Sequence, residues 1–78
     1  MSYEVMSISN LKRLRLQQKK TQVAVQLATG IDQSLLSKYE RGERLLSAQD
    51  LLTLADFYQT STDYLLGRTN RTEPYPKE

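Results

Sequence analysis

Residues 21–44 read TQVAVQLATGIDQSLLSKYERGER, and this stretch decides the fold. Thr21 is a residue type that caps helix N-termini, and Gly30 breaks the pattern that follows it. Together they predict a helix over residues 22–29. The alternation of Val23, Val25 and Leu27 is also typical of a strand, but no partner strand is evident, so the helix is favoured.

The second half of the stretch predicts another helix over residues 33–41. Asp32 is a good N-cap residue, and Gly42 suits the left-handed position that follows a helix. Gly30 supplies the tight turn between the two helices, in a backbone shape that a bulky residue would resist. The expected unit is therefore helix, glycine turn, helix.

Three further helices are expected on either side of this unit. Residues 8–18 carry apolar side chains every three residues, and residues 47–50 (Ser-Ala-Gln-Asp) resemble a capping box that opens a fourth helix. The fourth helix has an apolar stripe of Leu51, Leu54, Ala55 and Tyr58. A short fifth helix is expected after a cap at Thr60 or Ser61, and it stops at Gly67.

The expected fold is all-α, with five compact helices in one domain. Residues 8–67 form that domain, residues 1–7 an N-terminal arm, and residues 68–78 a polar, flexible tail with two prolines. Tyr75, between these prolines, is interpreted as part of the tail and not as a binding motif.

Composition argues against most kinds of catalyst. The 78 residues include no Cys and no His, and no glycine-rich phosphate loop or catalytic carboxylate pair is evident. We therefore expect no enzymatic activity, cofactor, metal site or small-molecule ligand. No apolar run approaches the roughly 20 residues of a membrane span, and no signal pattern opens the chain. The expected location is the cytoplasm.

Positive charge is concentrated in the first half of the chain. Residues 11–44 hold eight basic and three acidic side chains, a net charge of +5, whereas residues 45–78 have a net charge of −2. The chain as a whole carries only +2. A basic half on a nearly neutral chain suits a face that binds a polyanion, although a solvated helix surface gives the same pattern.

The order and spacing of these motifs resemble the lambda-repressor-like (Cro/CI, XRE-type) helix-turn-helix family. The resemblance spans about residues 8–67 and is carried by Thr21-Gln22, Gly30-Ile31, and residues 33–44, 51–56 and 61–67. It implies that the helix over residues 33–41 enters the DNA major groove while the preceding helix crosses the backbone.

The resemblance also implies roles for single residues. Those expected to face base edges are Gln33, Ser34, Leu35, Ser37 and Lys38, with Leu35 near the groove rim. Those expected to meet phosphates are Thr21, Gln22, Arg41 and Arg44. Arg15 and Glu40 match a partly buried ion pair between the first and third helices, and Gly30 has a structural role.

Three positions depart from the family pattern. Gln26 stands where a small residue is usual, so its side chain must turn outward or find a hydrogen-bond partner. Thr29 replaces a larger aliphatic residue, and Lys19-Lys20 replaces a glycine-aliphatic pair.

The leading hypothesis is a sequence-specific regulator of transcription, most simply a repressor, that binds double-stranded DNA as a homodimer. The dimer contact is expected in the region of the fifth helix, where Tyr58, Tyr64 and Leu65 are candidates for partial exposure. The alternative is a protein-interaction or antitoxin-type module that pairs with a second protein through the fourth and fifth helices.

Overall fold

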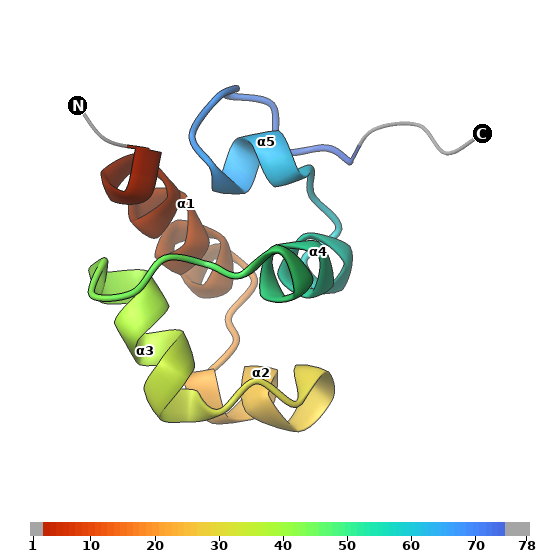
Figure 1. Cartoon of the computed structure of the whole chain (residues 1–78). Helices are drawn as coiled ribbons and strands as arrows, with labels where there is room; N and C mark the ends of the chain where they lie inside the picture. The colour runs from red at the N-terminus through yellow and green to blue at the C-terminus, as the bar shows by residue number, and fades with distance from the viewer. Residues whose placement is uncertain (1–2, 75–78) are drawn as a thin grey trace.

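The computed structural model describes the backbone of residues 3–74 and the side chains of residues 10–74. That part of the chain forms five helices and no strand: α1 Tyr3–Gln17, α2 Gln22–Thr29, α3 Gln33–Arg41, α4 Ala48–Phe57 and α5 Thr62–Leu65. The helices α2 and α3 lie together at one end of the domain and α5 at the other, with α1 and α4 between them (Figure 1). The all-α, five-helix prediction is confirmed.

A side chain caps the N-terminus of each of the four later helices, α2 to α5, and Asp32 does so at α3. The hydroxyl of Thr21 accepts from the Ala24 N–H at α2, and Ser47 accepts from the Asp50 N–H at α4. Ser61 is the residue that caps α5. Each cap satisfies a backbone donor that a helix start would otherwise leave without a partner.

The capping box predicted at α4 forms only in part. Ser47 makes its half of the box, but the carboxylate of Asp50 accepts a hydrogen bond of 2.5 Å from the Tyr39 hydroxyl. The α4 start is thereby tied to α3.

A single apolar core joins the helices. Fully buried leucines come from four of them, and burying one such side chain contributes about 1.5–3 kcal/mol. The core comprises Leu11, Leu14, Val25, Ile31, Leu36, Tyr39, Leu54, Ala55, Tyr58, Tyr64 and Leu65.

The first helix is longer than the sequence predicted. The apolar repeat placed its start at Ile8, but the helical backbone begins at Tyr3 and ends at Gln17, one residue before the predicted Gln18. Helix ends are the least certain part of a sequence-based assignment, and the apolar repeat alone does not mark where the backbone starts to be helical. The division into an arm (residues 1–7), a domain and a tail stays a prediction, and residues 75–78, including Tyr75, lie outside the described part.

The second segment is a helix, as favoured over the strand alternative. Of the alternating residues only Val25 is buried, whereas Val23 and Leu27 are exposed. Their alternation therefore does not mark one buried face. Among the residues that the structure describes, no helix is long and apolar enough to cross a membrane.

Candidate nucleic-acid interface

The turn between α2 and α3 depends on the backbone conformation of Gly30. Its φ is +79°, and its N–H donates to the Gln26 carbonyl at 2.8 Å. A Cβ at this position would meet no atom within 4 Å. The turn thus needs glycine for its left-handed backbone and not for space.

Thr29, one of the departures from the family pattern, closes the end of α2. Its hydroxyl donates to the Val25 carbonyl at 2.7 Å and accepts from the Ile31 N–H at 3.2 Å. Thr29 thus makes two local hydrogen bonds at the position where a larger aliphatic residue would contribute packing. Ile31 still reaches the core.

Gln26, another departure from the family pattern, has found a hydrogen-bond partner, one of the two outcomes expected from the sequence. Its side-chain oxygen accepts from the Gln33 backbone N–H at 2.6 Å. That N–H belongs to the first turn of α3, where donors have no partner inside the helix. Gln26 therefore helps Asp32 to cap the candidate recognition helix and fixes the distance between α2 and α3.

The helix α3 is strongly two-sided. Leu36, Tyr39 and Glu40 are buried against the rest of the domain. On the other side, Gln33, Ser34 and Lys38 are exposed, and Ser37 is partly buried. Four of the five side chains expected to face bases thus share the outer side or its margin.

Leu35, the fifth, is partly buried and packs against the core. Leu35 therefore contributes to the packing of the domain in addition to its predicted role at the DNA. The Ser34 hydroxyl donates to the Asp32 carboxylate, so Ser34 takes part in the helix cap as well.

The predicted ion pair between α1 and α3 forms. Arg15 Nε donates to one oxygen of Glu40 at 2.7 Å, and Arg15 Nη2 donates to the other at 3.0 Å. The side chains are 11% and 2% exposed, respectively. The hydrogen bond to Glu40 raises the pKa of Arg15. Arg15 Nη1 also donates to the Lys20 carbonyl at 3.0 Å, which ties the loop before α2 to the pair.

Gln22 connects this buried pair to the start of α3. Its side-chain nitrogen donates to Glu40 at 3.1 Å, and its side-chain oxygen accepts from Gln33 Nε2 at 3.4 Å. A chain of contacts thus runs from Arg15 through Glu40 and Gln22 to Gln33. This network therefore positions both Gln22, a candidate phosphate contact, and Gln33, a candidate base contact.

Two cationic recesses lie beside α3. An open one of about 620 Å³ is lined by Gln22 and Gln33 together with Arg15, Lys19 and Lys20, among others. The lysines of the third departure, Lys19-Lys20, therefore border the candidate interface, and Lys20 also lies over the Phe57 ring, 5.2 Å from its centroid.

The second recess, of about 190 Å³, is lined by Lys12, Arg15, Gln22, Ser37, Glu40 and Arg41. Lys12 was not among the predicted site residues. A signal for it exists in the sequence, because Lys12 lies one helical turn before Arg15 and so on the same side of α1.

The remaining candidate phosphate contacts differ in their surroundings. Thr21 is exposed and caps α2, and Arg44 is exposed on the loop after α3. Arg41 is paired with Glu43, which the sequence reasoning did not single out, although the two are separated only by the glycine that ends α3.

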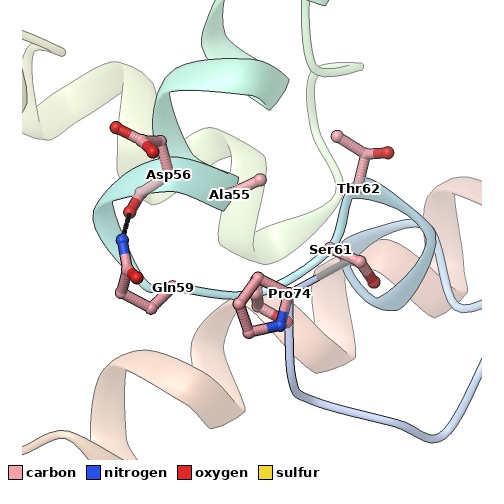
Figure 2. Close-up of a pocket in the computed structure, with 7 residues that line it drawn as sticks. Ala55, Asp56, Gln59, Ser61, Thr62 and Pro74 are labelled. Atoms are coloured by element: carbon pink, nitrogen blue, oxygen red, sulfur yellow. Dashed lines mark hydrogen bonds between the residues drawn. The ribbon is translucent and has the colours of Figure 1, made fainter. Parts of the chain in front are cut away.

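A separate groove lies between the end of α4 and the start of α5. It has a volume of about 500 Å³, and Pro74 of the tail lies across it (Figure 2). Gln59 Nε2 donates to the Asp56 carbonyl at 2.7 Å on its rim. The groove includes none of the predicted DNA contacts, and it is lined by Ala55, Asp56, Gln59, Thr60, Ser61, Thr62 and Pro74.

The expectation that three side chains near α5 are partly exposed was wrong. Tyr58, Tyr64 and Leu65 are 2%, 4% and 0% exposed, because Tyr64 and Leu65 of α5 and Tyr58 at the end of α4 all belong to the core. Burial also raises the pKa of the Tyr58 hydroxyl. Among the side chains of residues 10–74, the large apolar ones with the greatest exposure are instead Leu27 on α2, at 79%, Leu45 before α4, at 66%, and Leu52 on α4, at 63%.

Comparison with protein families finds a match to the helix-turn-helix family over residues 11–65. That range includes α2, the turn, α3 and the ion pair of Arg15 with Glu40. Searches of curated proteins and of solved structures found no match to this chain. The family match covers more than half of the 78 residues and agrees with the five-helix architecture. The chain therefore belongs to the lambda-repressor-like (Cro/CI, XRE-type) helix-turn-helix family of DNA-binding transcriptional regulators.

Proposed function

We propose that this chain is a sequence-specific repressor that binds double-stranded DNA as a homodimer, with α3 of each copy in the major groove. The observation that carries the proposal is that the exposed side of α3 lies next to two cationic recesses, which share Arg15 and Gln22. Phosphates beside the groove meet these cations, while the outer face of the helix meets base edges.

Roles on α3 follow from the chemistry of its exposed side. Gln33 forms a bidentate pair with adenine, and Lys38 reaches guanine or a nearby phosphate. Ser34 and Ser37 are short and let the backbone approach, and Leu35 contacts a thymine methyl at the groove rim. Thr21, Gln22, Arg41 and Arg44 contact phosphates and fix the register of the helix.

A second copy is part of the proposal because one domain contacts few bases. A two-fold dimer places its recognition helices about 34–36 Å apart, one turn of the DNA helix. The dimer contact belongs to the region of α5, where partly buried Leu66 remains available after Tyr64 and Leu65 are assigned to the core. Repression then follows from occlusion, since the dimer covers its operator. DNA as the partner is consistent with the expected cytoplasmic location.

Selection of bound duplexes from a random-sequence pool, with the full chain as bait, tests this function. We expect an inverted repeat whose half-sites are separated by about 10–10.5 base pairs. Enrichment of no sequence would contradict sequence-specific binding, and enrichment of a single half-site would contradict the dimer.

One observation favours the alternative of a module that pairs with a second protein. Leu45, in the loop after Arg44, and Leu52, on α4, are exposed, and Leu52 is not among the predicted DNA contacts. If this surface binds a protein encoded beside the gene, Leu52→Glu abolishes that pairing and leaves DNA affinity unchanged. If Leu52→Glu leaves the pairing intact, or abolishes both the pairing and DNA binding, the result argues against this alternative.

A further inference from the structure

All three nitrogens of the Arg41 guanidinium have a partner within the chain. Nε and Nη2 hold the two oxygens of Glu43 at 2.8 and 3.1 Å, and Nη1 donates to the Ser37 hydroxyl. Arg41 and Glu43 are nevertheless 53% and 54% exposed. We call these three residues the Arg41 clasp.

The helix end holds Glu43 in place. Gly42 has a φ of +79° and ends α3, and the Glu43 N–H donates to the Lys38 carbonyl at 2.9 Å. These bonds are the kind that close a helix with a left-handed glycine. The backbone of the turn thus fixes the position of Glu43 one residue beyond the helix end, and its carboxylate accepts two hydrogen bonds from Arg41 there. The guanidinium lowers the pKa of Glu43, so the carboxylate stays ionised.

The clasp lies where the proposed function needs a free cation. Arg41 lines the recess that also holds Lys12 and Gln22, and Ser37 belongs to the side of α3 assigned to bases. A DNA phosphate, like the Glu43 carboxylate, is an anion that can accept two parallel hydrogen bonds from a guanidinium. Only one of the two can occupy the fork of the guanidinium, and the displaced carboxylate then lies beside the DNA backbone, where like charges repel.

We propose that Glu43 is a built-in competitor for DNA phosphate, which holds Arg41 against Ser37 and so limits the affinity of the protein for DNA. The inference rests on the proposed function. It assigns Glu43 a regulatory role at that interface. The ion pair of Arg41 with Glu43 must be exchanged for one with a DNA phosphate before Arg41 contributes to binding. The competition acts on every sequence, because phosphates carry no base information.

The test compares Glu43→Gln with Glu73→Gln. Glu73 also pairs with an arginine two residues before it, Arg71, but in the tail, so both variants remove one negative charge from an Arg-x-Glu pair. Duplex affinity is measured against salt concentration, with a random-sequence duplex as the probe. If Glu43→Gln frees Arg41 for one more phosphate, the slope of log affinity against log salt steepens by about 0.9, equivalent to roughly 8-fold tighter binding at 0.1 M salt.

Arg41→Gln completes the cycle. In the Glu43→Gln background it should remove the gained 0.9 units, a larger change than it makes in the parent, where Arg41 must leave Glu43 before it meets a phosphate. Equal slopes for Glu43→Gln and Glu73→Gln, in a parent that does bind duplex DNA, overturn this inference alone. Failure of the parent to bind any duplex overturns the proposed function and the inference with it. Thermal melts of all variants check that folding is unchanged.

Discussion

Breaking the Arg15–Glu40 pair on either side should strongly destabilise the fold. Removing one partner of a buried ion pair strands the other charge and costs about 3–5 kcal/mol. Glu40→Gln keeps the size of the side chain, and Arg15 retains its bond to the Lys20 carbonyl and 11% exposure. The loss of stability caused by Glu40→Gln should therefore lie near the lower end of that range.

Arg15→Met should cost more. It leaves the Glu40 carboxylate, 2% exposed, with Gln22 as its one remaining donor among the hydrogen bonds described above. We expect a loss near 5 kcal/mol. A domain of this size has a total stability of only about 4–12 kcal/mol, at about 0.05–0.15 kcal/mol per residue. The variant should thus lose a large share of its stability and melt far below the parent.

Urea and thermal unfolding, followed by circular dichroism, measure these losses. The double variant should lose clearly less than the sum of the two single variants, because it leaves no unpaired charge. Arg41→Gln is the matched control: it breaks an exposed pair, which typically contributes little, and should melt with the parent. A single variant at Arg15 or Glu40 that melts with the parent, or strictly additive losses, would refute the reasoning.

Three further outcomes are expected. Gly30→Ala should cost about 1–2 kcal/mol in unfolding experiments because L residues disfavour a φ of +79°, and Gly30→Asn less; equal stability of both with the parent would contradict the assigned strain. The pKa of Asp32 is lowered by its bonds to Ser34, so its contribution is complete above the ordinary Asp pKa and declines as the pH falls through the lowered value. The melting temperature of the parent should consequently approach that of Asp32→Ala in acid, and a constant difference from neutral to acidic pH would exclude the charge as the cause. Sedimentation at saturating protein should give two copies per operator, and one copy would refute the dimer.

Local chemistry in the sequence was enough to predict most helix boundaries. Thr21, Asp32 and Ser47 satisfy donors in their own first turn, and Gly30 and Gly42 adopt the left-handed conformation at helix ends. Such interactions span a few residues, so the sequence displays them directly. The start of α1 has no comparable signal in the apolar repeat, and the prediction was five residues too late.

Contacts between distant residues were harder to foresee. The resemblance to a family implied the Arg15–Glu40 pair, but Gln26 was expected only to need some partner, and the structure identifies it as the Gln33 backbone. The burial of Tyr58 and Tyr64 depends on how α5 packs on α1 and α4. An aromatic residue on α5 or at the end of α4 suits a core and an interface equally well, so its sequence position did not decide between them.

The reading of bases by α3 is tested most directly with Gln33→Ala and Arg44→Ala. Their affinities are measured for the selected operator and its single-base variants at two salt concentrations. Gln33→Ala should cost about 1–3 kcal/mol on the operator and relax the preference at one base position. Arg44→Ala should weaken binding to all sequences alike and make the salt slope shallower by about one unit. If Gln33→Ala instead lowers the affinity equally for every sequence, α3 is not the element that reads the DNA.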